Sequence, residues 1–225
     1  MLSKTRGIVI SYIKYRETSL IARIYTEEFG LHSCLINGVR NKSSKSKIAL
    51  FQPLTLLDLI LYYKADGMSR ISEIRCSYPY RSLHTDARKS AIAFFVKEIL
   101  YKTLQEETSN PELYEFLDHS LKILDESTDH YENFHLIFLL KLSSFLGFNP
   151  ERLEDLMPGE WELLSEEENM LYTSILKSEY KSIIRMTNQT RRRFLDILLK
   201  FFSIHVSNFD RMNSLSVLQE LMRNY

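Results

Sequence analysis

The chain has 225 residues, 44% of them hydrophobic, which is enough to bury the core of one large domain or two smaller ones. Lys and Arg together number 29, as do Asp and Glu, so the net charge is zero. This balance hides an asymmetry, because residues 1–81 carry 13 basic and 6 acidic side chains (+7), whereas residues 82–225 carry 16 and 23 (−7). The basic N-terminal part favours a nucleic-acid partner for that part of the chain.

Other sequence features argue against a membrane or secreted protein. The longest apolar runs, near residues 134–140 and 194–202, are interrupted by charged side chains and are shorter than the roughly 20 residues of a bilayer span. Residues 1–6 lead directly into a strand pattern, without the apolar core of a signal peptide. Cys34 and Cys76 are too few for a disulfide framework and suit a reducing compartment. We therefore expect a cytoplasmic protein.

The first third of the chain has the pattern of β-strands. Segments rich in β-branched and aromatic residues alternate with turn signals such as Gly30 and Asp66-Gly67. Ile71 and Ile74 are three residues apart, which indicates a bulge or a one-turn helix in the last segment. Five short strands in this length predict a small closed barrel, which leaves no open edge. The predicted strands are residues 7–14, 19–26, 31–39, 54–63 and 69–76.

From Ser82 onward the hydrophobic period changes to about 3.6, which predicts an all-α part. Residues 132–145 are apolar on most faces and should form a buried central helix. Residues 151–168 hold eight acids and one base, which indicates a solvated, irregular segment. Asn110 and Thr190 are the expected N-caps of two helices. The other predicted helices are residues 86–105, 111–124, 167–177, 178–186, 191–206 and 214–223, and the predicted domains are 1–81 and 82–225.

Residues 40–47 (RNKSSKSK) form the most basic connection of the predicted barrel. This loop contains no acidic residue and precedes the apolar run that starts at Ile48. Such a loop is suited to a phosphate backbone, although Lys-Ser-rich segments are also common as simple solvated loops. Its four cations are Arg40, Lys42, Lys45 and Lys47.

A small barrel of this kind commonly binds single strands by combining a cationic groove with aromatic stacking platforms. The candidate DNA-contacting cations are Arg6, Lys14, Arg23, Arg40, Lys42, Lys45, Lys47, Arg70 and Arg75, with Arg16 beside them. The candidate platforms are Tyr12, Tyr15, Tyr25, Phe29, Tyr62, Tyr63, Tyr78 and Tyr80, most of which should serve in core or edge packing. Binding of this type is sequence-tolerant, since no segment resembles a base-reading helix.

The sequence contains none of the common catalytic or nucleotide-binding motifs, so we expect no enzyme and no catalytic residue. His32 and Cys34 share one face of a strand but lack two further metal ligands. Glu179-x-Lys181 superficially matches the end of a metal-dependent nuclease motif, but it falls on a predicted helix, far from any strand-borne aspartate. A nuclease is thus the weaker alternative. A protein-binding adaptor without DNA contact, favoured by the −7 part, is the other.

Several short motifs follow one another in a specific order. They are TRGIVI (5–10), YRETSL (15–20), YTEEFG (25–30), GVR (38–40), LFQPLTLLDL (50–59), LGF-x-P (146–150) and the closing run 214–221. Their order resembles that of the RecO family of bacterial DNA repair proteins. The resemblance is dense in the first 60 residues and at one turn in the helical part.

This resemblance implies an N-terminal OB-fold followed by a helical domain, which agrees with the division expected at Arg81. It implies binding of single- and double-stranded DNA, annealing of complementary strands, and loading of RecA, together with RecR, onto DNA coated by the single-strand-binding protein SSB. It also implies a cytoplasmic, nucleoid-associated protein. Many family members carry a four-cysteine zinc module after the position of Pro150. This chain has no cysteine after Cys76, so we expect no zinc and no other cofactor.

The implied SSB partner requires a site for its tail, which is acidic and ends in apolar residues. A hydrophobic groove rimmed with basic groups would suit it. The candidates are Arg191, Arg192 and Arg193. Because cations at a helix N-terminus oppose the helix dipole, we expect some of these arginines to be paired with an internal acid instead.

Overall fold

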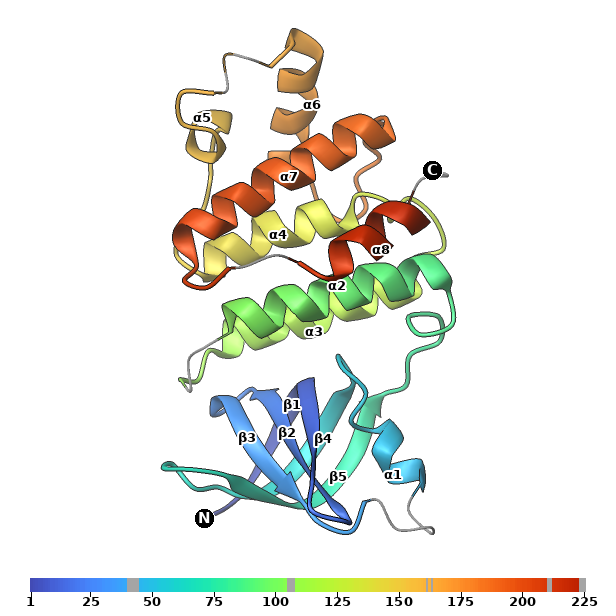
Figure 1. The fold of residues 1–225 in the computed structure, drawn as a ribbon, viewed down its shortest axis with the longest axis vertical. Helices are drawn as coiled ribbons and strands as arrows, with labels where there is room; N and C mark the ends of the chain where they lie inside the picture. Colours follow the sequence, from blue (N-terminus) through green and yellow to red (C-terminus); the bar gives the residue numbers. More distant parts are fainter. Residues whose placement is uncertain (40–44, 105–107, 161, 163, 210–211, 223–225) are drawn as a thin grey trace. The chain divides into compact units, whose positions relative to one another are not determined.

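A closed barrel is formed by five strands in the order β1-β2-β3-β5-β4 (Figure 1). The structure is a computed structural model that describes residues 1–39, 45–104, 108–160, 162, 164–209 and 212–222, with the backbone alone at residues 45 and 46. Adjacent strands pair antiparallel, except β3 and β5, which pair in parallel. The predicted five-stranded OB-like barrel is confirmed. Its strands are β1 (Leu2–Tyr15), β2 (Ser19–Thr26), β3 (Gly30–Ile36), β4 (Leu56–Tyr62) and β5 (Ser69–Tyr78).

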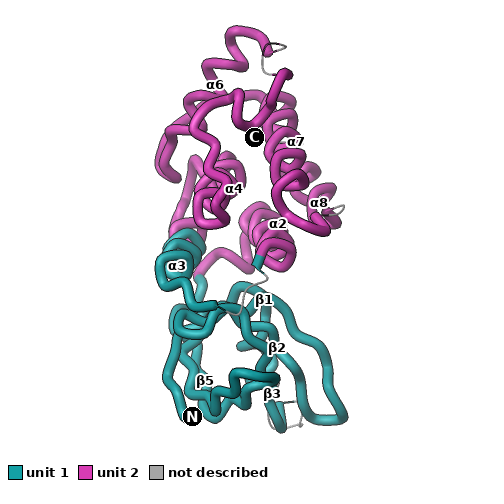
Figure 2. The backbone as a smooth tube through the Cα atoms, turned by 90° about the vertical axis from the view of Figure 1, so that its left-hand side faces the viewer, with its two compact units in different colours: residues 1–80, 104–122 teal, residues 81–103, 123–225 magenta. Residues whose placement is uncertain are grey.

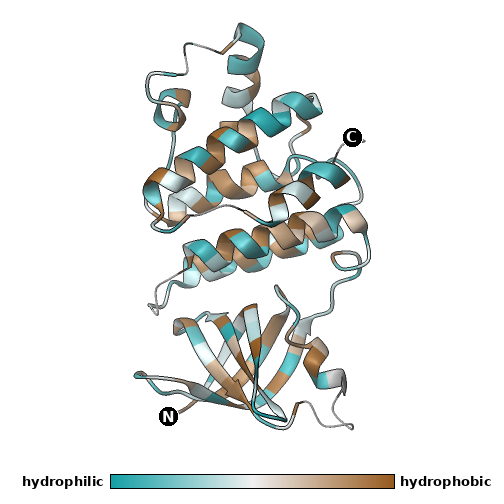
Figure 3. Ribbon diagram, viewed as in Figure 1, coloured by the Kyte–Doolittle hydropathy of each residue, from teal (hydrophilic) through white to brown (hydrophobic). Residues whose placement is uncertain are grey.

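Apolar side chains of alternate strand positions fill the barrel. Leu20, Ala22 and Ile24 of β2 lie in this core, while the residues between them face outward. Phe51, which follows α1 (Lys45–Ala49), is fully buried in the same cluster. Figure 3 shows the resulting mixture of hydrophobic and hydrophilic residues along the strands.

β1 is longer than predicted and begins at Leu2 instead of Gly7. Residues 2–8 pair with β4. The buried positions at the start of this strand are Ser3 and Thr5. Because these residues are polar, the sequence pattern did not indicate a strand there. A bulge occurs at Ile10 of β1. A second bulge lies at Ser72 of β5, opposite the register shift between Ile60 and Leu61 of β4. This second bulge is one of the two alternatives that the spacing of Ile71 and Ile74 predicted. The basic loop also ends earlier than expected, because α1 begins at Lys45.

The rest of the described chain is helical, as predicted. α4 is buried along most of its length, which confirms it as the central helix of its part of the chain, and it packs against α2, α6 and α7. α2 also packs against α8. The helices are α2 (Ala87–Thr103), α3 (Pro111–Glu126), α4 (Phe134–Phe145), α5 (Leu153–Leu156), α6 (Glu166–Leu176), α7 (Asn188–His205) and α8 (Ser214–Leu221).

Three predictions in the second half were wrong in detail. The predicted helix at 178–186 is absent from this described segment, which is a turn followed by extended chain. Asn133 Nδ2 donates to the carbonyl oxygen of Ile184 at 2.7 Å, so a tertiary contact satisfies the backbone that a helix would have used. Thr187, three residues before the expected cap, accepts a hydrogen bond from the Thr190 amide and starts α7 at residue 188. The acidic 151–168 segment contains the short α5.

By its internal contacts the chain divides into two compact units, coloured in Figure 2. The first contains residues 1–80 and 104–122, and the second contains residues 81–103 and 123–225. In the first unit, Ser109 Oγ donates to the carbonyl oxygen of Glu27 at 2.9 Å, which ties the approach to α3 to the turn between β2 and β3. The assignment of domains as 1–81 and 82–225 stays a prediction.

Candidate nucleic-acid interface

The outer face of β1, β2 and β3 carries no acidic side chain, because none of these three strands contains Asp or Glu. Cross-strand partners in a sheet point to the same side. Ser11, Arg23 and Ser33 are partners in one row, and the row beside it is Ile13, Ile21 and Leu35. These residues alternate with the buried core positions, so both rows face outward.

Arg70 extends this face across the parallel contact, since Leu35 pairs with Arg70 of β5. Arg70 is exposed and Arg23 is half-buried. Lys14 is exposed near the end of β1, but it pairs with the core residue Leu20 and so lies on the other side of the strand from the two outward rows. The fold therefore brings two of the predicted cations, Arg23 and Arg70 from two different strands, to the acid-free face.

The surface between these cations is aliphatic instead of aromatic. Ile13 is 62% exposed, and Ile21 and Leu35 are partly exposed. Among the predicted stacking platforms, Tyr25 is buried and Phe29 stacks on Tyr63 with ring centroids 4.0 Å apart. Most of the predicted aromatic platforms thus pack against other residues of the protein. Tyr12 and Tyr62 are the more exposed ones, at 37% and 55%.

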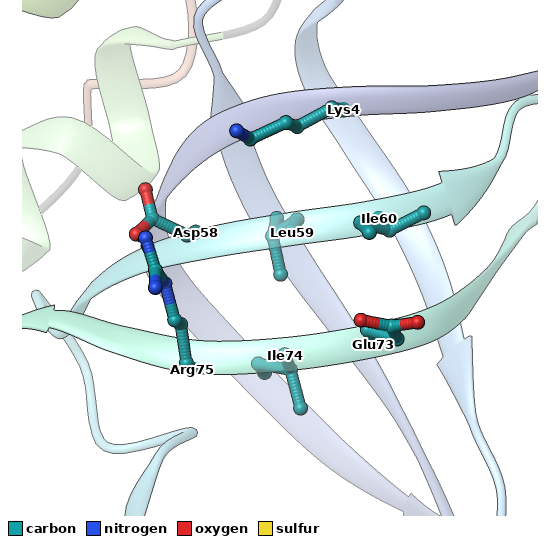
Figure 4. A pocket seen from close by; sticks show the side chains of 7 residues that line it. All are labelled: Lys4, Asp58, Leu59, Ile60, Glu73, Ile74 and Arg75. Atoms are coloured by element: carbon teal, nitrogen blue, oxygen red, sulfur yellow. Dashed lines mark hydrogen bonds and ion pairs between the residues drawn. The ribbon is translucent and has the colours of Figure 1, made fainter.

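Arg6 and Arg75 lie elsewhere on the barrel, beside carboxylates. Arg6 pairs with Glu27 and Glu115, and these contacts raise its pKa. Arg75 Nε lies 2.8 Å from Asp58 Oδ2 (Figure 4). Both arginines belong to a surface of mixed charge, which is less suited to a phosphate backbone than the acid-free face.

Part of the predicted basic loop falls outside the described residues. This holds for Arg40 and Lys42, and at Lys45 the backbone alone is described. Lys47 is exposed on α1. The loop therefore stays a prediction for DNA contact.

The three arginines of α7 have separate surroundings. Arg191 is buried, with Nε donating to Asn133 Oδ1 at 2.9 Å. Arg192 donates to the carbonyl oxygen of Gln219 at 2.8 Å. Arg193 pairs with Glu168 at 2.5 Å, so the predicted pairing with an internal acid is confirmed for this residue.

A groove lies between α7 and α8, and no motif in the sequence predicts it. Its volume is about 720 Å³, and Lys200 lies on its edge, paired with Glu160 at 2.8 Å. Apolar groups provide much of its lining, notably Leu199, Phe209, Met212 and Leu215. It supplies a hydrophobic groove, and its basic residue Lys200, like Arg193, is paired with an acid.

Two further sequence expectations concern metals and membranes. Across the residues that the structure describes, no three His, Cys, Asp or Glu side chains gather as a metal site would require. Within the same residues, no helix has both the length and the hydropathy needed to cross a bilayer.

The cationic barrel followed by helices defines a protein of the OB-fold class with a separate helical part. Models of the N-terminal and C-terminal regions of recombination protein O match residues 1–80 and 84–154. DNA repair protein RecO of Phocaeicola vulgatus is 35% identical over 239 residues, covering 98% of this chain and 99% of the relative. The RecO proteins of Christiangramia forsetii and Flavobacterium johnsoniae are 36% and 34% identical, each with the same coverage. The chain belongs to the RecO family of DNA repair proteins.

Proposed function

We propose that this protein binds DNA through the acid-free outer face of β1, β2 and β3 and anneals complementary single strands there. Together with RecR, it would load RecA onto DNA coated by SSB. The observation that carries this proposal is the convergence of Arg23 and Arg70 on one face whose three main strands contain no carboxylate. Such a face attracts phosphate without opposing it.

Annealing requires that the protein bind two single strands, and it involves no bond cleavage. Cations that neutralise phosphates reduce the repulsion between two complementary strands, so that bases can pair. The aliphatic row of Ile13, Ile21 and Leu35 offers contact to base faces but no hydrogen-bonding groups that would read a sequence. Annealing by this surface should therefore be independent of sequence.

A salt series of single-strand binding tests the site. Each lost phosphate contact should reduce the slope of log K against log salt by about 0.7 on single strands. We expect the double variant Arg23→Ala/Arg70→Ala to lose about 1.4 from the slope, and the quadruple alanine variant of Arg40, Lys42, Lys45 and Lys47 to lose about 3. Lys177→Ala/Lys181→Ala, which removes two exposed charges from the helical unit, is the matched control.

The outcomes separate the alternatives. If annealing and the slope are unchanged in both barrel variants, the proposed DNA site is wrong. A wild-type protein that does not bind DNA would favour the adaptor hypothesis. Cleavage of labelled single strands with Mg²⁺ that Glu179→Ala abolishes would favour the nuclease hypothesis.

The tail of SSB is assigned to the groove between α7 and α8. Its apolar end would enter the space lined by Met212 and Leu215, and an acidic residue would meet Lys200. Fluorescence anisotropy with a labelled SSB tail peptide tests this assignment. Lys200→Glu should weaken binding about tenfold or more, whereas the same loss in Arg193→Glu alone would favour the arginine cluster.

A further inference from the structure

A small cavity lies within the second unit, beside the first two turns of α7. Its volume is about 20 Å³, which is room for one particle about as large as a water molecule. Three helices that can be followed in Figure 1 contribute polar side chains to its lining. They are His135 of α4, Asn188, Arg191 and Arg192 of α7, and Gln219 of α8.

His135 brings to this cavity a buried polar atom that lacks a hydrogen bond. The side chain is 2% exposed, and its Nδ1 has no hydrogen-bond partner among the described residues. Desolvation and the charge of Arg191 lower the pKa of His135 to about 3, so the ring is neutral at pH 7. A neutral histidine can carry its proton on Nδ1 and donate it. Because a buried polar atom without a partner is destabilising, an occupant of the cavity that accepts this hydrogen bond would be favoured.

Two guanidinium groups give the cavity a positive charge. Arg191 is buried and donates to the side-chain oxygen of Asn188, which is neutral. Arg192 is half-buried and donates to the backbone carbonyl oxygen of Gln219, which is also neutral. Across the part of the chain that the structure describes, no Asp or Glu lines the cavity. Asp196 interacts with Arg192 electrostatically but lies outside the lining.

The place of the cavity on α7 also favours a negative occupant. The residues of α7 that line it are spaced i, i+3, i+4 and i+7, so they share one face that starts at the first residue of the helix: Asn188, Arg191, Arg192 and Leu195. A helix N-terminus attracts anions and is destabilised by cations. Arg193, which does not line the cavity, is offset by Glu168. An anion in the cavity would offset Arg191 and Arg192 in the same way.

The size and charge of the cavity together restrict its occupant. A metal cation would be repelled by the two guanidinium groups. Phosphate and sulfate have several oxygens and need more than the volume of one water molecule. A water molecule would satisfy His135 but would leave the two arginine charges without an anion. A monatomic anion such as chloride, which is only slightly larger than water, satisfies all three side chains.

We propose that this cavity binds one halide ion, with chloride as the natural ligand, between His135 Nδ1 and the guanidinium groups of Arg191 and Arg192. The ion would hold the start of α7 against α4 and α8. Gln219 also lines the larger groove between α7 and α8, so the ion would stabilise one wall of that groove. The inference is independent of the proposed DNA site.

Thermal unfolding of the full chain in sodium chloride, sodium bromide and sodium gluconate at equal ionic strength and neutral pH tests the site. Chloride and bromide should raise the Tm by about 3–6 °C relative to gluconate once their concentration is about ten times the Kd. His135→Phe and Arg192→Gln should each lose this difference between salts. Arg193→Gln, which removes a cation of the same helical turn outside the cavity, is the matched control and should keep it.

Bromide also locates the site directly, because a crystal soaked in sodium bromide should show an anomalous difference peak in the cavity. If the wild type melts equally in the three salts and no such peak appears there, the cavity holds water and the inference is wrong. If the difference between salts persists in both cavity variants, the halide acts elsewhere and the inference is also wrong. Should one of these variants fail to fold, the other variant and the bromide peak still decide.

Discussion

Arg6 holds Glu27 through two hydrogen bonds, from Nε to Oε2 at 2.8 Å and from Nη2 to Oε1 at 2.7 Å. The same guanidinium contacts Glu115 of α3, so one cation joins β1, the residue after β2 and a helix within the first unit. A phosphate would have to compete with two carboxylates for Arg6. This arrangement explains why a candidate chosen for its charge alone is better interpreted as structural.

We therefore expect Arg6→Ala to lower the free energy of unfolding by about 1 kcal/mol or less, because the pair is partly exposed. Single-strand affinity should fall less than in Arg23→Ala. Urea unfolding followed by circular dichroism, together with DNA titrations, measures both effects. Equal stability with strongly reduced DNA binding would show that Arg6 serves the DNA site after all.

The same pair predicts a pH dependence. The hydrogen bonds from Arg6 lower the pKa of Glu27 below its usual value in the folded state. The stabilisation is therefore present above the unfolded pKa of about 4.3 and is lost as pH falls through the lower folded value. Glu27→Gln should be less stable than the wild type at pH 7, and this difference should shrink as pH falls below about 4. A constant difference down to pH 2.5 would contradict the assignment.

The barrel and most helices were predictable because their hydrophobic periods are regular. α4, for example, is buried on most faces, and most of its residues are apolar. The prediction of a helix at 178–186 was wrong because the carbonyl group of Ile184 accepts a hydrogen bond from Asn133. Asn133 lies about 50 residues away in the sequence, so the local pattern could not indicate this contact.

The candidate site was predictable in composition but not in arrangement. The sequence identified the cations of the barrel, yet only strand register shows that Arg23 and Arg70 share a face, and that Arg6 and Arg75 lie beside Glu27 and Asp58. Composition does not show which charged residues, distant in the sequence, become neighbours in the fold.

Gly30 should be one of the least replaceable residues of the barrel unit. Its φ is +63°, and a Cβ added there would lie 2.4 Å from the carbonyl oxygen of Thr108. Gly159 has a similar φ of +74°, but no neighbouring atom of the described residues lies within 4 Å of an added Cβ, so Gly159→Ala is the matched control for backbone strain. Both variants should lose about 1 kcal/mol from strain, and Gly30→Ala should lose measurably more in urea unfolding. Equal losses would show that the loop at Thr108 yields freely.

The two thiols should differ in reactivity with Ellman's reagent. Cys76 is exposed on β5, whereas Cys34 is buried in the barrel core and its burial raises the pKa of its thiol to about 12. At pH 8 the native protein should therefore react rapidly at one thiol, and the denatured protein should react at both. Cys76→Ser should abolish the fast phase and leave folding unchanged. A fast phase that persists in this variant would mean that the barrel opens near Cys34.

His135 should make the helical unit sensitive to acid. This side chain is buried on α4, and desolvation, with the nearby Arg191 charge, lowers its pKa to about 3. In the unfolded chain a histidine titrates near 6.5, so the unfolded state binds the proton first and stability falls as pH decreases from about 6.5 towards 3. The slope should approach 1.4 kcal/mol per pH unit at most. His135→Leu should reduce this slope between pH 4 and 6, and the exposed His119→Leu should not. An unchanged slope in His135→Leu would assign the acid sensitivity to another group.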